Sequence, residues 1–353
     1  MVACTIIARN YLAQARILAH SFAEHVPDGR MVVLVLDPDA APTPFADEAF
    51  EILRPTDIMD PVEFGQMATM YTVVELATAV KPWLLEHLLG QAPAVSYFDP
   101  DIRFFSDPVF IDDLAREHGV VMTPHATEPL PRDDVRTPNE DLILFAGIYN
   151  LGFVAVGGEQ GLALARWWQS RLRRDCLIDP PSGRFVDQRW MDLAPGYFAP
   201  YILRNPGCNT AWWNLPSRDV RGHDGHWTVN GEDLVFFHFS GYDPQLPHLV
   251  SKHQGPFPRV LLSEVPDLAR LFAAYGQAML DEGHAESSAI PYGLNTVDGL
   301  TLDRIMRSLF RTALMSAEAS GDDPPPNPFT DGVPAFVAWL SKPVPGLADA
   351  RNQ

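Results

Sequence analysis

The first hundred residues alternate short apolar runs with segments of helical spacing. The pattern predicts strands at 2–8, 31–36, 50–53 and 94–98, and helices at 12–25 and 71–89. Short apolar runs that end at turn residues are typical of strands buried on both faces of a sheet. Strands that alternate with helices form a mostly parallel sheet with helices on both faces. The alternation therefore predicts an α/β fold.

The second half of the chain is less regular. Strands are predicted at 119–123 and 234–239, and a helix at 160–173. Farther on, helices are predicted at 268–280, 300–317 and 336–340, and the segment 321–334 is rich in Pro, Asp and Gly, which is typical of a loop. We therefore predict an α/β domain over residues 1–260 and a helical C-terminal extension over residues 261–353 with a Pro-rich loop at 321–334.

Composition excludes several classes of protein. The net charge of −19 argues against a nucleic-acid partner, because such binding needs a basic face. The three cysteines form no metal pattern and indicate buried thiols in a reducing cytoplasm. Arg9 and Arg16 interrupt the N-terminal apolar stretch, so it does not resemble a signal peptide, and no apolar run reaches the ~20 residues of a transmembrane segment. We expect a cytoplasmic protein, with peripheral contact at the inner membrane face left open.

The stretch YFDPDIRFF contains the pair of acidic residues that most clearly indicates chemistry. Asp99 and Asp101 follow the strand predicted at 94–98, with Pro100 between them. In extended backbone such residues point to the same side, about 7 Å apart. Carboxylate oxygens suit Mg2+ or Mn2+, and such an ion can bridge nucleotide phosphates and neutralise a departing diphosphate. A turn with two solvated aspartates is the alternative.

Three other segments carry candidate site residues. His238, after the late strand, could be a third metal ligand or a structural histidine, and Lys252 and His253 could meet phosphate oxygens. Asp37-Pro38-Asp39 could be a plain turn or a nucleotide contact. It also resembles the start of a phosphatase motif, but lacks the Thr or Val expected two residues later.

Taken in order, the motifs resemble those of retaining GT-A glycosyltransferases, particularly glycosyltransferase family 8, the group of glycogenin and bacterial galactosyltransferases. The resemblance covers about residues 1–255 and implies a GT-A (Rossmann-like) mixed sheet flanked by helices. The matching stretches are Arg9-Asn10-Tyr11, YFDPDIRFF, Tyr149-Asn150-Leu151-Gly152-Phe153, Val186-Asp187-Gln188 and His238-Phe239-Ser240-Gly241.

The resemblance implies a role for each matching residue. Mn2+ or Mg2+ would be bound by Asp99, Asp101 and His238. Asp187 and Gln188 would lie near the reacting carbon and Asn150 at the donor sugar. The nucleoside would be flanked by Ala8, Asn10 and Tyr11. Gln188 cannot act as a base, but its carbonyl could stabilise positive charge, whereas Asp187 could also be a nucleophile or base.

The lysines depart from the family pattern. In the family a lysine soon after H-F-x-G contacts the diphosphate, and Lys252 is the nearest candidate. The family's K-P-W follows that motif, whereas here Lys81-Pro82-Trp83 lies much earlier, within a predicted helix. The departure indicates a distant branch. It leaves open whether Lys81 reaches the donor phosphates or whether the Lys-Pro pair only marks a helix kink.

The resemblance implies a metal-dependent hexosyltransferase that retains configuration. The donor would be a nucleotide-sugar, with UDP favoured and GDP left open, and the acceptor a glycan or glycolipid such as a bacterial surface polysaccharide. A non-catalytic sugar-nucleotide or glycan-binding module of the same fold is one alternative, and a phosphatase or nucleotidyltransferase is another. The C-terminal helices could also form a homodimer.

Overall fold

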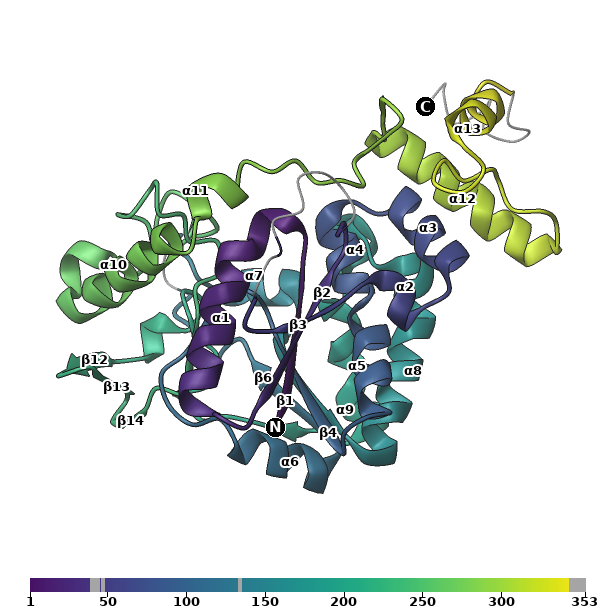
Figure 1. The fold of residues 1–353 in the computed structure, drawn as a ribbon. Coiled ribbons are helices and arrows are strands. Elements are labelled where there is room, and N and C mark those ends of the chain that lie inside the picture. The colour runs from purple at the N-terminus through teal and green to yellow at the C-terminus, as the bar shows by residue number, and fades with distance from the viewer. Residues whose placement is uncertain (39–44, 46–47, 133–134, 343–353) are drawn as a thin grey trace.

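The computed structural model describes residues 1–38, 45, 48–132 and 135–342 of the chain (Figure 1). Asp39 and the predicted end of the C-terminal extension, residues 343–353, lie outside this part. Within the described residues the main sheet has seven strands in the order β10-β6-β7-β4-β1-β2-β3. Their bounds are β1 Val2–Ile7, β2 Arg30–Val35, β3 Glu51–Leu53, β4 Ala94–Phe98, β6 Val120–Pro124, β7 Tyr149–Gly157 and β10 Tyr201–Ile202.

Strand direction in this sheet explains how distant motifs meet. β1 is parallel to β2 and β4, β2 to β3, and β6 to β10, whereas β7 is antiparallel to both β4 and β6. The predicted mixed α/β sheet flanked by helices is therefore confirmed. Because β7 runs in reverse, Phe153 in its middle pairs with Phe98 at the end of β4, and the first residues of β7 lie beyond that end. The stretch around Asn150 thus lies beside the acidic pair that follows β4.

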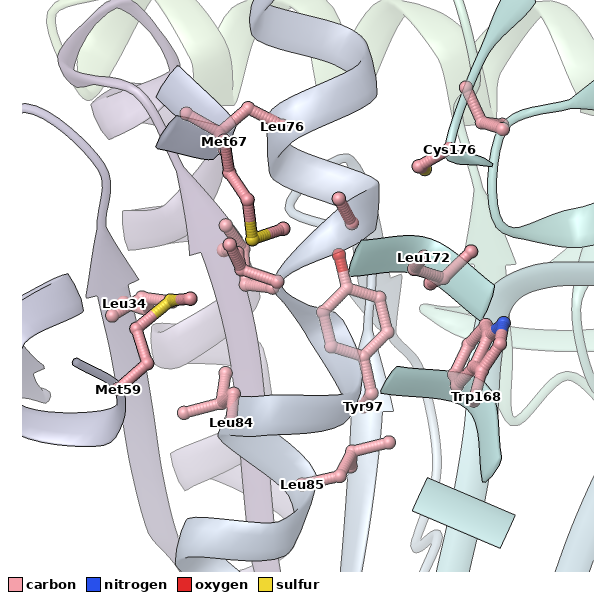
Figure 2. Close-up of a cluster of buried hydrophobic side chains, with 14 of the residues drawn as sticks. Leu34, Met59, Met67, Leu76, Leu84, Leu85, Tyr97, Trp168, Leu172 and Cys176 are labelled. Atoms are coloured by element: carbon pink, nitrogen blue, oxygen red, sulfur yellow. The ribbon is translucent and has the colours of Figure 1, made fainter. Parts of the chain in front are cut away.

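Helices cover both faces of the sheet. On one face α1 (Leu12–His25) and α6 (Phe110–His118) pack through an apolar cluster that includes Leu18, Phe22 and Ile111. On the other face lie α3 (Pro61–Met70), α4 (Val73–Ala79), α5 (Lys81–Leu89) and α8 (Gly158–Asp175). Figure 2 shows part of this second cluster, with the Tyr97 ring between leucines of α5 and Trp168 of α8.

A second, three-stranded sheet carries the late histidine to the acidic pair. It consists of β11 (Thr210–Ala211), β15 (Phe236–His238) and β5 (Ile102–Phe104), and β15 is antiparallel to β5. His238 pairs with Ile102, the residue after Asp101. The smaller strands are β8 Ile178–Asp179, β9 Arg184–Phe185, β12 Val220–His223, β13 His226–Val229, β14 Glu232–Asp233, β16 Thr296–Val297 and β17 Leu300–Thr301. The short 3-10 turns include η1 (Arg9–Tyr11) and η3 (Gln188–Leu193).

The single helix predicted at 71–89 is wrong, because the structure has two. α4 begins after Thr72, which forms a capping box with Glu75, and the helix ends at Ala79. Pro82 has no N–H with which to continue the backbone ladder, so α5 starts anew at Lys81. The Lys-Pro pair, for which a helix kink was one prediction, thus begins a separate helix.

The C-terminal helices lie on opposite sides of the molecule. Figure 1 shows α10 and α11 beside α1, and α12 beside α3 with α13 packed on α12, the two pairs joined by a long connection. Phe272 of α10 packs on Phe237 and Phe239 of the second sheet, and Phe310 of α12 belongs to the cluster shown in Figure 2. The remaining helices are α2 Pro55–Ile58, α7 Glu140–Ala146, α9 Ala194–Phe198, α10 Pro266–Asp281, α11 His284–Ser287, α12 Arg304–Ser320 and α13 Val333–Leu340.

Arg307 ties α12 to the α/β core. Its buried guanidinium donates to the carbonyl oxygens of Ala68, Thr69 and Tyr71 at 2.8, 3.2 and 2.5 Å. Ala68 and Thr69 lie in the last turn of α3 and Tyr71 is its C-cap, where backbone carbonyls have no partner within the helix. Residues beyond 260 therefore complete elements that begin before residue 70. None of the helices in the described ranges is long and apolar enough to cross a membrane.

Candidate metal centre and active site

Asp99, Asp101 and His238 come together at the end of β4. One ligand atom from each lies within 4.8 Å of the other two. His238 Nε2 is 3.0 Å from Asp101 Oδ1 and 3.7 Å from Asp99 Oδ2. Two carboxylates and an imidazole are suitable ligands for Mn2+ or Mg2+. The three predicted ligands thus fit a divalent cation in both donor type and spacing.

Backbone hydrogen bonds fix this arrangement. The Asp99 N–H donates to the carbonyl of Gly152 in β7 at 2.7 Å, and the Phe239 N–H donates to the carbonyl of Asp101 at 2.9 Å. The first bond joins the acidic turn to the main sheet, and the second joins it to β15. Tyr97, which the sequence did not single out as a site residue, donates its hydroxyl to Asp99 Oδ1 at 2.8 Å.

The charges at this centre are mutually dependent. Burial alone would raise the pKa of Asp101, but the nearby His238 and its hydrogen bond lower the pKa below its usual value. Burial would lower the pKa of His238, but the charge and hydrogen bond of Asp101 and the charge of Asp99 together raise the pKa above its usual value. Burial, and then the charges of Asp101 and Asp99, raise the pKa of Tyr11 to about 12. Tyr11, predicted at the nucleoside, therefore stands close to the acidic pair.

Gly152 is required by the close approach of His238. A Cβ at this position would lie 2.3 Å from His238 Cε1 and 2.7 Å from Nδ1. Real Cβ atoms do not approach other heavy atoms so closely. The glycine of the Tyr149–Phe153 motif thus makes room for the imidazole on β15.

Asn209 is a site residue that the sequence analysis missed. Its side chain is buried, its Oδ1 lies 3.3 Å from His238 Nδ1, and its Nδ2 donates to Asn150 Oδ1 at 3.0 Å. The ring of Trp213 packs edge-on against His238, with centroids 5.1 Å apart. Asn209 comes from an irregular loop with no strand or helix pattern, so no local signal marked it.

Lys81 and Asp187 form a sealed ion pair. Lys81 Nζ lies 2.7 Å from Asp187 Oδ2 and donates to the Leu151 carbonyl at 2.7 Å. The sequence left open whether Lys81 reaches the donor phosphates, and the family resemblance implied that Asp187 lies near the reacting carbon. The structure instead buries both, because α5 directs the lysine under β7. Burial raises the pKa of Asp187, and the charge of Lys81 opposes the rise.

Gln188 and Asn150 lie next to this ion pair. Gln188 Oε1 accepts from the Leu151 N–H at 3.2 Å and from Asn150 Nδ2 at 3.4 Å, and its Nε2 donates to the Ala146 carbonyl at 2.8 Å. Both side chains are buried. His125, also buried, lies 3.4 Å from Asn150 Nδ2, and burial lowers its pKa to about 4, so its ring is neutral near pH 7. The predicted sugar-contact residues thus belong to one hydrogen-bonded network.

Asp37, for which the sequence left a plain turn and a nucleotide contact open, has partners within the protein. It accepts from the Arg9 N–H at 3.0 Å and from the Gly293 N–H at 2.8 Å, and lies 3.3 Å from the Arg9 guanidinium. Both carboxylate oxygens are therefore engaged inside the protein. Ala8 is also buried, and its carbonyl accepts from the Tyr11 N–H at 2.9 Å.

His253 lies near Asp101, on the exposed side of the metal centre, and Lys252 precedes it in the chain. Lys252 is exposed. Burial lowers the pKa of the neighbouring His253, and the charge of Lys252 lowers it further. The charge of His253 in turn helps to lower the pKa of Asp101. Asn10, in η1, has a buried Oδ1 without a hydrogen-bond donor. The structure thus places His253 near Asp101, with Lys252 next to His253 in the chain.

Comparison with known proteins gives distant similarities. No protein-family model matches the chain. It is 28% identical to the uncharacterized protein YfnD of Bacillus subtilis (strain 168) over 251 residues, which cover 67% of this chain and 76% of the relative. It is 26% identical to the uncharacterized protein YfnF of the same strain over 252 residues, covering 68% and 80%.

The similar solved structures include three glycosyltransferases. The galactosyltransferase LgtC, in complex with donor and acceptor sugar analogues, is 14% identical, with 79% of this chain and 96% of that chain covered and a TM-score of 0.44. GlyE of Streptococcus pneumoniae TIGR4 is 12% identical, covering 84% and 66%, with a TM-score of 0.43. Mouse xyloside xylosyltransferase 1 is 12% identical, covering 67% and 97%, with a TM-score of 0.38. These likenesses are too distant to assign an activity.

Proposed function

We propose that this protein is a metal-dependent glycosyltransferase that takes a sugar from a nucleotide-diphosphate donor. The observation that carries the proposal is the convergence of Asp99, Asp101 and His238 within 4.8 Å. These residues come from two sheets and from positions more than a hundred residues apart in the chain. They are the ligands that the family 8 resemblance implied. A bound Mn2+ or Mg2+ would neutralise charge that develops on the departing diphosphate.

The residues around the centre have separate roles in this proposal. Tyr11 and Asn10 flank the nucleoside, and Lys252 binds the diphosphate from the exposed side. Gln188 and Asn150 face the donor sugar from the other side. Because an amide oxygen carries partial negative charge, Gln188 can stabilise an oxocarbenium-like carbon without gaining or losing a proton. The buried ion pair of Asp187 with Lys81 supports a role for Asp187 in positioning the neighbouring Gln188. To act as a nucleophile, the Asp187 carboxylate would first have to break its ion pair with Lys81.

The finer assignments rest on the resemblance. We propose a hexosyl donor linked to UDP, with GDP as the second choice, and a retaining reaction. The acceptor is a glycan or glycolipid of a bacterial surface polysaccharide pathway, reached from the cytoplasm at the inner membrane face. A homodimer through the C-terminal helices would involve α10–α13. The competing phosphatase and nucleotidyltransferase readings predict release of phosphate or pyrophosphate instead of a nucleoside diphosphate.

A screen of nucleotide-sugars by thermal unfolding, with and without Mn2+, tests the proposal. A ligand at a hundred times its Kd stabilises the folded state by about 2.7 kcal/mol, so the donor should raise Tm by a few degrees only when Mn2+ is present. Asp101→Ala should abolish this shift, whereas Asp28→Ala, at an exposed turn, should retain it. Slow Mn2+-dependent release of nucleoside diphosphate should accompany the shift. A donor shift that survives Asp101→Ala would disprove the assigned metal site.

A further inference from the structure

A chain of side-chain amides runs from the backbone of β7 to His238. It starts at the Gly152 N–H, which donates to Asn150 Oδ1 at 3.1 Å. Because a backbone N–H can only donate, the atom that it meets on Asn150 must be the oxygen. The orientation of the Asn150 amide is thus fixed by the main chain.

The same reasoning fixes Asn209. Asn150 Oδ1 also lies 3.0 Å from the side chain of Asn209, which must therefore present its nitrogen there. That nitrogen also donates to Thr123 Oγ1 at 2.8 Å. The oxygen of Asn209 then faces His238 Nδ1 at 3.3 Å. An amide oxygen only accepts, so this contact requires a proton on Nδ1.

The backbone at Asn209 is built for this orientation. Its φ is +52°, a left-handed conformation that asparagine tolerates better than most residues. Asn214 holds the loop closed: its Nδ2 donates to the Asn209 carbonyl at 2.9 Å, and its Oδ1 accepts from the Ala211 N–H at 2.9 Å. The Asn209 side chain is consequently buried and fixed before any ligand arrives.

We propose that Asn209 is a positioning residue for the metal centre, which is an inference that rests on the proposed metal-dependent function. By accepting from Nδ1–H, Asn209 keeps the proton of the neutral ring on that nitrogen. The lone pair of Nε2 then points between Asp99 and Asp101, where a cation would bind. The second hydrogen bond of a histidine ligand commonly sets its tautomer and ring orientation. The chain also connects the metal ligand with Asn150, the proposed sugar contact.

The experiment compares Asn209→Ala with Asn230→Ala. Asn230 is an exposed asparagine with a φ of +53°, so its replacement changes the same backbone preference far from His238. Titration calorimetry with Mn2+ alone should show a 10–100-fold weaker affinity for Asn209→Ala, the usual effect of losing an outer hydrogen bond to a ligand, and an unchanged affinity for Asn230→Ala. Asn209→Asp keeps an acceptor for Nδ1–H and should recover part of the loss.

Nuclear magnetic resonance of protein with 15N-labelled histidine gives a readout that simple destabilisation would not change. In the Mg2+-loaded wild type the Nδ1–H of His238 should be protected from exchange with water. In folded Asn209→Ala this signal should exchange rapidly. If Asn209→Ala binds Mn2+ as tightly as the wild type and keeps a protected Nδ1–H, the proposed role of Asn209 is overturned, while the proposed function stands. A wild-type protein that binds no Mn2+ would overturn the proposed function, and this inference with it.

Discussion

Two charged clusters flank the end of β4, and they differ in how their carboxylates are neutralised. In the metal centre the side chains of Asp99 and Asp101 remain 30% and 20% exposed. In the second cluster the side chains of Asp187 and Lys81 are only 3% and 1% exposed. The ammonium group of Lys81 neutralises the Asp187 carboxylate from within the protein. It provides two carboxylates with one imidazole at the metal centre, which leaves negative charge for a cation from outside.

The largest expected effect comes from breaking the sealed cluster. Lys81→Met would leave the Asp187 carboxylate buried without its cation, which typically costs about 3–5 kcal/mol. Urea unfolding without metal should show this loss. Replacing both partners, in Lys81→Met with Asp187→Leu, should restore most of the stability. If Lys81→Met alone is as stable as the wild type, the contrast between the two clusters is wrong.

A smaller effect on stability is expected at the contact between the metal centre and β7. Gly152→Ala would drive a methyl group into His238, and overpacking of this kind costs about 1–3 kcal/mol. The displaced imidazole should also weaken Mn2+ binding in calorimetry. Gly196→Ala is a matched control, because a Cβ at Gly196 meets nothing within 4 Å and its φ is not left-handed. Equal Mn2+ affinity in both variants would show that His238 does not depend on the glycine.

The smallest effect on stability is expected for Lys252, the exposed lysine that precedes His253. The sequence contains three lysines, Lys81, Lys252 and Lys342, and the last two are exposed. Lys252→Ala should change the free energy of unfolding by no more than about 0.5 kcal/mol, as is usual for surface substitutions. It should nevertheless weaken binding of the nucleotide-sugar donor, measured by titration with Mn2+ present, whereas Lys342→Ala should leave that affinity unchanged. Equal donor affinities would remove Lys252 from the site.

The sequence predicted those parts of the fold that depend on local pattern. The helix at 12–25 and the strand at 94–98 agree with α1 and β4 to the residue, because apolar spacing and flanking turn residues define both. Helix α3 was missed although Asp60 and Pro61 form a clear N-terminal signal, with Asp60 accepting from two backbone N–H groups. The residues that α3 buries include Gly65, Ala68 and Thr69, whose small side chains gave only a weak apolar stripe in the sequence.

Site residues could be predicted where their motifs resembled those of a family. They could not be predicted where contacts between distant parts of the chain determine a side chain's burial and partners. Asp99, Asp101 and His238 could be proposed together because each stands at or just after the end of an apolar strand, in a motif that matches the family. The burial of Lys81 depends on Asp187, which lies 106 positions later, and that of Asp37 depends on Arg9 and Gly293. Asn209 acts through a loop conformation that only its neighbours fix. Such pairings arise from tertiary packing and leave no trace in local periodicity.

The contacts of Arg307 and Gly293 have a consequence for biosynthesis. While the chain is still on the ribosome, the terminal carbonyls of α3 have no guanidinium, and Asp37 has no Gly293 N–H. Both partners leave the exit tunnel only when most of the polypeptide has been made. The nascent α/β half therefore cannot complete its folding until residues beyond 260 have been synthesised. Translation that stops near residue 260 should yield an incompletely folded product that chaperones bind and proteases degrade.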